Sequence, residues 1–254
     1  MNSAQRLEQI FLAIRHRAPS GQPNQVPTGI DVWPSVFDRT GLSGHELEDA
    51  AQECSMAVRE ELGHLAHQLA DASVPEPLYA HHIANLRDIT ASRFFPVEWR
   101  QLAGNVKEEN LTMLQWAGLY LGGTLSEEVD KEVARLTSEV DKLLTEMQST
   151  NLPPSLRSFL LRNLRSVKNS LWRYKASGLG PLRDTLQTVR GTGDQQRQEI
   201  RDAAENLSEP ERSIWKRAAD TFNTAVTVCD KATKLDKGYT LASGAVKALL
   251  DMWP

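Results

Sequence analysis

The chain has 254 residues, of which 40% are hydrophobic and 24% charged, with 12 prolines and 15 glycines. This composition is typical of a globular protein that buries a sizeable core, and it excludes a fibrous or fully disordered chain. The formal net charge of -4 excludes a protein that is basic over its whole surface, and it repels nucleic acid at long range.

The features that report on compartment favour a cytoplasmic protein. Cys54 and Cys229 fall at apolar positions of helical repeats, where a free thiol behaves as a small hydrophobe, so we expect a reduced, cytosolic setting. The apolar run from Ile10 to Ile14 is too short for a signal peptide. The longest uncharged run, residues 110–126, falls short of the roughly 20 apolar residues that cross a bilayer, and we expect no transmembrane segment.

Helical periodicity dominates the chain and two-residue alternation is nearly absent, which predicts an all-α fold without a sheet. The first helix is predicted over residues 3–17, and the Pro- and Gly-rich loop 18–30 that follows it is expected to be mobile. A long second helix is predicted to begin at Ser43, with Glu46 as its capping-box partner, and to end before Pro75.

Two further helices are predicted in the first half of the chain. The apolar spacing indicates a short helix around residues 83–89, and an aromatic corner is expected at residues 94–99. Asn105 and Glu108 are expected to open the next helix, and the Gly-Gly pair at 122–123 is expected to end it.

The second half of the chain gives a clearer pattern. Thr124 and Glu127 are predicted to cap a helix whose apolar residues alternate at spacings of four and three, as in antiparallel bundles and coiled coils. After a Pro-Pro turn, Ser155 is expected to cap a basic helix over residues 155–176. The apolar stripe of the helix that Thr124 caps consists of Val129, Val133, Leu136, Val140, Leu143 and Met147.

Three more helices are predicted after the basic helix. One begins at Pro181 and is weakened at residues 191–193, and another begins at Ser208 with Glu211 as its capping partner. A short last helix is predicted over residues 241–253.

Short turns between long helices imply antiparallel neighbours, and we therefore predict an antiparallel bundle of long amphipathic helices. The expected domains are an N-terminal helical region, residues 1–123, and a C-terminal helical bundle, residues 124–254. One continuous domain is the alternative.

The most informative feature is a stretch, residues 147–183, that contains no Asp or Glu although the chain as a whole is acidic. The cations of the predicted basic helix occupy an arc of about 160° opposite its apolar side, with Trp172 among them. Arginine next to an exposed aromatic ring can grip phosphates and stack on bases. The candidate interaction residues, called the basic face below, are Arg157, Arg162, Arg165, Lys168, Trp172, Arg173 and Lys175.

Several partners for the basic face are open from the sequence. Residues 43–76 carry eight acidic residues against Arg59 alone, so this stretch of the same chain or of a second copy could neutralise it. We rank a solvated or internally paired face first, a protein partner or homo-oligomer second, and nucleic acid third.

The motifs that could carry chemistry are weak. Glu61 and His64 have the Glu-x-x-His spacing of di-iron bundles, but no second copy exists, and a solvated histidine is the favoured interpretation. Ser213 and Lys216 have the Ser-x-x-Lys spacing without its companion elements, and the Gly-x-Gly at 191–193 has no preceding strand. We therefore predict no catalytic residue, no cofactor and no metal.

The apolar segment 241–253 permits two interpretations. It could contact a membrane peripherally, yet membrane-surface helices usually need several Lys or Arg, and this segment carries Lys247 alone. Closing the core of its own bundle or of a dimer is the favoured interpretation.

The segment from Leu152 to Gly178, which begins Leu-Pro-Pro-Ser-Leu-Arg-Ser-Phe-Leu, resembles a group of bacterial all-helical proteins without a known activity. The patch from Asp31 to Phe37 is similar to the N-terminal region of the same group. The resemblance implies a bacterial, cytosolic setting and nothing more specific. Membership of a multi-component system such as antiviral defence is a separate hypothesis about the context of the protein. It identifies no catalytic residue.

These features lead to one leading hypothesis and two alternatives. The leading hypothesis is a non-enzymatic interaction or accessory protein that binds another protein, or itself, through its charged face or its apolar C-terminus. Nucleic-acid binding by the basic helix 155–176 is the first alternative. An enzyme whose site is assembled from scattered side chains is the second.

Overall fold

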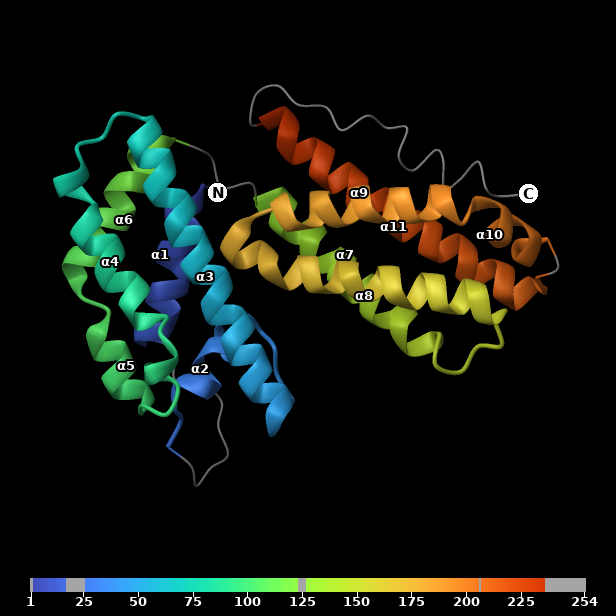
Figure 1. The fold of residues 1–254 in the computed structure, drawn as a ribbon, viewed down its shortest axis with the longest axis horizontal. Helices are drawn as coiled ribbons and strands as arrows, with labels where there is room; N and C mark the ends of the chain where they lie inside the picture. Colours follow the sequence, from blue (N-terminus) through green and yellow to red (C-terminus); the bar gives the residue numbers. More distant parts are fainter. Residues whose placement is uncertain (1, 17–25, 123–126, 206, 236–254) are drawn as a thin grey trace. The chain divides into compact units, whose positions relative to one another are not determined.

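The computed structural model describes residues 2–16, 26–122, 127–205 and 207–235, and over these ranges it is all-α, as predicted (Figure 1). The same ranges contain no strand, and their isolated β-bridge joins Thr28 and Glu98. None of the helices in these ranges has the length and apolar character that crossing a bilayer requires.

The chain divides into two compact units. The first unit comprises Met1–Leu125 together with Lys175–Gly178, and the second comprises Ser126–Tyr174 and Leu179–Pro254. The predicted domain border between residues 123 and 124 stays a prediction. Each unit is described below by itself.

The helices of both units have the following bounds. The first unit contains α1 (Ser3–His16), α2 (Gly29–Val36), α3 (His45–Asp71), α4 (Ala80–Ile89), α5 (Trp99–Asn105) and α6 (Glu108–Leu121), with 3-10 turns η1 (Glu76–Leu78) and η2 (Ser92–Phe94). The second unit contains α7 (Glu127–Glu146), α8 (Pro154–Ser177), α9 (Gly180–Gln195), α10 (Arg197–Ala204) and α11 (Glu209–Leu235), except that the last turn of α8 groups with the first unit.

Helix α1 lies in the core of the first unit because one of its sides is wholly apolar. Leu7, Phe11 and Ile14 are fully buried, as the spacing predicts, and the helix packs on α3 and α6. Its start is a reciprocal capping pair that the predicted boundaries do not include. The Asn2 side chain accepts the backbone N–H of Gln5 at 3.0 Å, and the Gln5 side chain accepts that of Asn2 at 3.1 Å.

Helix α2 is an element that the sequence pattern does not predict. It begins at Gly29 behind a capping box in which the Asp31 carboxylate accepts the backbone N–H of Thr28 at 2.8 Å. Only glycine fits at position 29, because a Cβ there would lie 2.2 Å from the carbonyl oxygen of Phe94. The expected loop 18–30 is therefore helical at its end, and its residues 18–25 lie outside the described part.

Helix α3 confirms the predicted second helix but corrects its start. The helix begins at His45, and its N-cap is Gly44 at a φ of 54°, without a side-chain cap. Glycine adopts this left-handed conformation without strain, so the chain turns at Gly44 and the predicted Ser43–Glu46 capping box does not form. The buried stripe consists of Ala51, Cys54, Val58, Leu62, Leu65 and Leu69.

Of the remaining helices of the first unit, α4 and α6 were predicted, whereas α5 was not. Helix α4 coincides with the predicted short helix. In the aromatic corner, the Trp99 Nε1 donates a hydrogen bond to the Ile14 carbonyl oxygen at 2.8 Å. The predicted start of α6 at Asn105 is wrong, because Asn105 ends α5, where its side chain donates to the Gln101 carbonyl, and α6 begins at Glu108.

Helices α7 and α11 of the second unit pack against each other in antiparallel sense. Arg217 forms two hydrogen bonds with the Glu146 carboxylate, at 2.6 and 3.1 Å, and Lys231 pairs with Glu132. Residue numbers therefore rise along one helix as they fall along the other. The hydrogen bond to Glu146 raises the pKa of Arg217.

The contacts of α8 with its neighbours are also those of antiparallel helices. Tyr174 donates to Asp130 of α7 at 2.6 Å, and Lys168 pairs with Asp141 of α7 at 2.6 Å. On the other side, the Ser170 hydroxyl lies 2.5 Å from that of Thr185 in α9. The predicted antiparallel bundle as a whole stays a prediction.

The predicted apolar stripes of the second unit meet in one core. All six residues of the α7 stripe are buried. They join one hydrophobic cluster with buried residues of α8, α9 and α11, among them Leu160, Leu164, Val167, Leu186 and Phe222.

Several predicted boundaries in the second unit need correction or cannot be compared. Helix α8 begins at Pro154, so Ser155 lies inside it, because proline suits the first helical position. Helix α9 continues through residues 191–193 to Gln195 without a break. The predicted cap at Thr124 and the predicted helix 241–253 lie outside the described residues.

The predicted capping pair at the start of α11 is confirmed. The backbone N–H and the hydroxyl of Ser208 both donate hydrogen bonds to the Glu211 carboxylate, at 2.7 and 2.6 Å. Both hydrogen bonds lower the pKa of the Glu211 carboxyl group below its usual value, the bond from the hydroxyl more than the bond from the backbone N–H.

This capping pair should make stability depend on pH. A lowered carboxyl pKa contributes stability above the unfolded-state pKa, and the contribution is lost as the pH falls through the folded-state pKa. We expect Glu211→Gln to lower the thermal unfolding temperature at about pH 7 and to leave it almost unchanged at a pH below the folded-state pKa of Glu211. Circular dichroism at both pH values measures this, with exposed Glu205→Gln as the control. An equal loss at both pH values would contradict the prediction.

Candidate functional site

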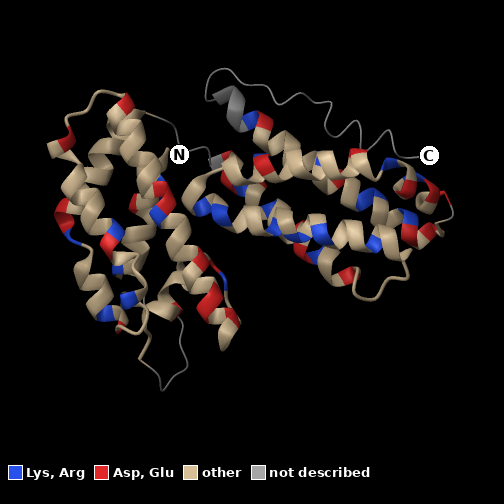
Figure 2. Cartoon of the chain, viewed as in Figure 1, with Lys and Arg blue, Asp and Glu red and all other residues tan. Residues whose placement is uncertain are grey.

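The basic face lies on α8, the helix that the sequence pattern predicts to be basic. Leu156, Leu160, Leu164, Val167 and Leu171 are buried on one side of the helix. Figure 2 shows Lys and Arg along α8 on its other side, in a segment without Asp or Glu. An amphipathic helix of this kind presents its charged side to solvent or to a polar neighbour.

Three members of the basic face already have partners. Lys168 pairs with Asp141 of α7, and the half-buried Arg157 lies 3.4 Å from the Gln148 carbonyl oxygen, which accepts its hydrogen bond. Lys175, in the turn that belongs to the first unit, pairs with Asp38 and donates to the Val36 carbonyl oxygen at 3.2 Å. These three charged side chains therefore take part in contacts within the fold.

The other members form the outward part of the face. Arg162 is exposed and donates one hydrogen bond to the Gln196 side chain at 3.3 Å, and no carboxylate of the described residues pairs with it. Arg165 is exposed and has no hydrogen-bond or ion-pair partner among the described residues. The Arg173 guanidinium carbon lies 5.4 Å from the centre of the half-buried Trp172 ring, a cation–π distance.

In the acidic stretch 43–76, too, some acidic residues have a partner in the structure and others have none among the described residues. Glu61 is buried and pairs with Arg6 at 2.6 Å, and Glu53 pairs with Arg39 at 2.6 Å. Glu46, Asp49 and Glu60 are exposed and have no partner in the described part of the chain. Figure 2 shows acidic residues gathered at the N-terminal end of α3, where the helix dipole favours them. Pairing of this stretch with the basic face stays a prediction.

The Glu-x-x-His spacing does not assemble a metal site. The Glu61 carboxylate is engaged by Arg6, and His64 is 69% exposed with its Nδ1 3.5 Å from Glu61. His82 instead contacts the buried Asn110 side chain at 2.9 Å. In the described ranges no three His, Cys, Asp or Glu side chains gather in a way that could hold a metal ion.

Cys54 and Cys229 are buried and are not joined in a disulfide. Burial raises the pKa of the Cys229 thiol to about 12, so it is protonated and unreactive at neutral pH.

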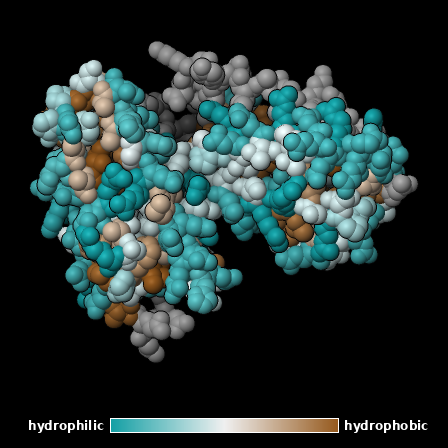
Figure 3. Space-filling model, in the orientation of Figure 1, coloured by the Kyte–Doolittle hydropathy of each residue, from teal (hydrophilic) through white to brown (hydrophobic). Residues whose placement is uncertain are grey.

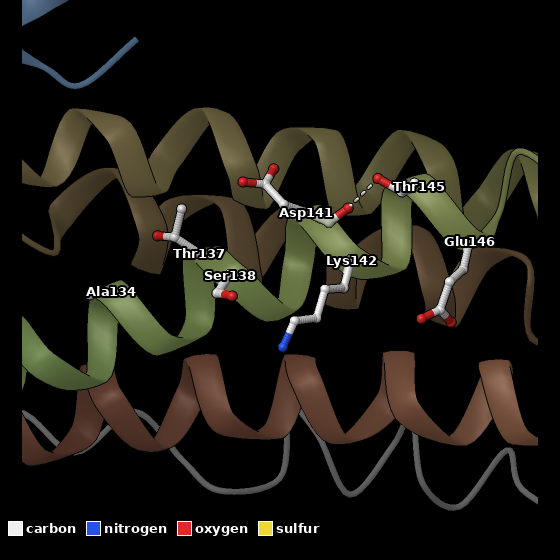
Figure 4. A pocket seen from close by; sticks show the side chains of 7 residues that line it. All are labelled: Ala134, Thr137, Ser138, Asp141, Lys142, Thr145 and Glu146. Atoms are coloured by element: carbon white, nitrogen blue, oxygen red, sulfur yellow. Dashed lines mark hydrogen bonds between the residues drawn. The ribbon is translucent and has the colours of Figure 1, made fainter. Parts of the chain in front are cut away.

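A surface depression of about 620 Å³ lies along α7 (Figure 4). The side chains that line it come from this helix alone, and its charged groups are already paired: Asp141 with Lys168, and Glu146 with Arg217. The Thr145 hydroxyl donates to the Asp141 carbonyl oxygen at 2.9 Å. The depression therefore presents mainly groups that already serve the bundle.

An exposed apolar patch at the end of α6 escapes the sequence pattern. Trp116 and Tyr120 stack with ring centres 5.3 Å apart, and Leu119 between them is 82% exposed. The signal in the sequence is the i, i+4 spacing of Trp116 and Tyr120, on the side of α6 opposite the buried Leu111 and Leu114. The described surface is otherwise largely hydrophilic in the view of Figure 3, with small scattered apolar groups.

Comparison of the chain with protein-family models, with curated proteins and with solved structures finds no match.

Proposed function

We propose that the protein is a non-enzymatic interaction protein whose basic face binds an acidic surface of a protein partner. The observation that supports the proposal is the exposure of Arg162 and Arg165 without a carboxylate partner among the described residues. Arginine and tryptophan are both enriched at protein interfaces, where they serve as anchors. The net charge of -4 favours protein over nucleic acid, because an acidic protein repels phosphate at long range.

The wider setting rests on the resemblance and on the cysteines. Two buried thiols without a disulfide are typical of a reducing compartment, and we place the protein in the bacterial cytosol. As an accessory member of a multi-component system, such as one for antiviral defence, it would use the basic face to dock on another component.

Nucleic-acid binding is the second candidate, and the same outward residues favour it. Arg162, Arg165 and Arg173 could contact phosphates while Trp172 stacks on an unpaired base. If about six phosphates are contacted, the affinity should fall with salt at a log-log slope of about -5. If the partner is a protein, we expect the chain to bind no nucleic acid, or to bind it with a log-log slope near zero.

The experiment is affinity purification of the protein from its native host, with identification of the protein and nucleic acid that co-purify. We expect Arg162→Glu with Arg165→Glu to abolish capture of a protein partner. Arg201→Glu with Lys216→Glu makes the same change of charge at exposed positions outside α8 and should leave capture intact. Equal capture by both double variants would overturn the proposal, and capture of nucleic acid alone would favour the second candidate.

A further inference from the structure

Two exposed stripes of the chain have the same spacing and opposite character. On α3, the stripe contains Glu46, Asp49, Glu53 and Met56, with spacings of three, four and three residues. On α8, the stripe contains Arg162, Arg165, Asn169 and Trp172, with the same three spacings. Spacings of three and four keep side chains on one face of a helix.

Both stripes face away from the apolar sides of their helices. All four α3 residues are exposed, and Met56 is 45% exposed although it is apolar. On α8, Arg162, Arg165 and Asn169 are exposed and Trp172 is half-buried. Each stripe extends over about 15 Å of helix at 1.5 Å per residue, so the two match in length.

Side-by-side, parallel docking of the two stripes pairs every position with a chemically suitable partner. Glu46 would meet Arg162, and Asp49 would meet Arg165, which gives two guanidinium–carboxylate pairs. Of these four, Glu46, Asp49 and Arg165 have no partner within the described part of the chain.

The other two positions of this register are also complementary. Glu53, already paired with Arg39, has a second carboxylate oxygen that could accept from the Asn169 amide. Met56 would lie on the Trp172 ring, where a thioether makes a favourable contact. The apolar pair at one end of the stripe explains why a methionine stands on the polar side of α3.

We propose that the acidic partner of the basic face is a second copy of this chain, which docks the α3 stripe of one copy on the α8 stripe of the other. This inference rests on the proposed function and names its partner. Charge complementarity carries it, since each copy displays, at equal spacing, carboxylates without a cation and guanidinium groups without a carboxylate among the described residues. Each copy carries both surfaces, so two copies close reciprocally into a dimer, or the contact repeats into longer assemblies.

The test measures self-association of the full chain by sedimentation velocity at low and high salt. We expect the wild type to associate and to dissociate as salt rises, because the pairs are at the surface. Arg162→Glu with Arg165→Glu, and separately Glu46→Lys with Asp49→Lys, should each weaken association by about tenfold or more. An equimolar mixture of the two double variants should associate again, since both contacts of a mixed pair are complementary: the two unchanged stripes meet in one contact and the two reversed stripes in the other.

Arg201→Glu with Lys216→Glu is the matched control and should associate like the wild type. Circular dichroism verifies that each variant is folded. If a reversal unfolds the chain, Arg162→Gln with Arg165→Gln and the salt dependence of the wild type still test the contact.

Two results would overturn the inference. One is a wild type that stays monomeric at high micromolar concentration in low salt. The other is a mixture of the two reversals that fails to associate. A monomeric chain whose stability falls with either reversal and recovers when both are combined would show that the stripes pair within one chain. A monomer that still loses capture of a protein partner with Arg162→Glu and Arg165→Glu would leave the proposed function standing without this inference.

Discussion

Replacement of Arg6 with methionine is expected to lower the free energy of unfolding by about 3–5 kcal/mol, because it leaves the buried carboxylate of Glu61 without its cation. The side chain of Glu61 is 3% exposed and lies 2.6 Å from the Arg6 guanidinium, whose own side chain is 12% exposed. A carboxylate this deeply buried cannot recover its solvation when the partner is removed.

Arg6 also holds the last turn of α8. Its Nε donates to the Ala176 carbonyl oxygen at 2.9 Å, a helix-end carbonyl that lacks an intrahelical donor. Gly178, at a φ of 63°, lies against the same guanidinium, since a Cβ there would be 3.1 Å from the Arg6 Cζ. Methionine keeps an unbranched, apolar stem but supplies neither donor, so both contacts are lost together.

Urea denaturation of the full chain, followed by circular dichroism, measures the effect. Arg15→Met is the matched control on the same helix, because Arg15 pairs with Glu108, which is 74% exposed, and a surface pair contributes about 0–1 kcal/mol. Arg6→Met combined with Glu61→Leu should recover much of the loss, since no charge then remains buried. Equal effects of Arg6→Met and Arg15→Met would show that the buried pair does not stabilise the fold.

The apolar stripes were predictable from the sequence because burial repeats with the helical period. The stripes of α3 and α7 are buried along almost their whole length, and each helix lies within a few residues of its predicted range. Helix starts were less predictable, because a Ser, Thr or Asn three residues before a Glu occurs by chance as well as in capping boxes that form. Of the pairs proposed, Ser208–Glu211 forms, whereas Ser43–Glu46 and Asn105–Glu108 do not.

Helix α2 shows where tertiary contacts override local sequence. Pro34 lies inside it and lacks the N–H that would bond to the Ile30 carbonyl, so local propensity disfavours a helix there. The segment is instead held by the backbone of the aromatic corner, since the N–H of Gly29 donates to the Val97 carbonyl at 2.9 Å and the N–H of Ile30 to the Phe95 carbonyl at 3.1 Å. These bonds join residues far apart in the chain, and no local pattern contains them.

The sequence predicts the basic face as the charged side of a helix, but it does not predict which of its members have a partner in the fold. A helical wheel places Arg165 and Lys168 in one arc, yet it contains no neighbouring helix. In the structure Lys168 is close enough to α7 to pair with Asp141, whereas Arg165 remains without a partner among the described residues. The Arg6–Glu61 pair was invisible for the same reason, because its members are 55 residues apart.

The largest expected effect on the second unit comes from Leu143→Asp in α7. Leu143 is 1% exposed and belongs to the same hydrophobic cluster as Leu160 and Leu164 of α8. The substitution removes a buried leucine and introduces a carboxyl group without a hydrogen-bond partner, so we expect a loss of at least about 4 kcal/mol at pH 7. Urea denaturation of the full chain measures it.

Controls separate burial from the change of charge. Ser138→Asp places the same group at an exposed position of α7 and should change stability by less than about 0.5 kcal/mol, whereas Leu143→Met should cost less than about 1.5 kcal/mol because it conserves volume. Burial favours the neutral form of the introduced carboxyl group, which raises its folded-state pKa above its unfolded-state value. The loss of unfolding free energy relative to the wild type should therefore be smallest at low pH. It should grow as the pH rises from the unfolded-state pKa to the folded-state pKa of the introduced group. Wild-type stability of Leu143→Asp at neutral pH would contradict the placement of this residue in the core.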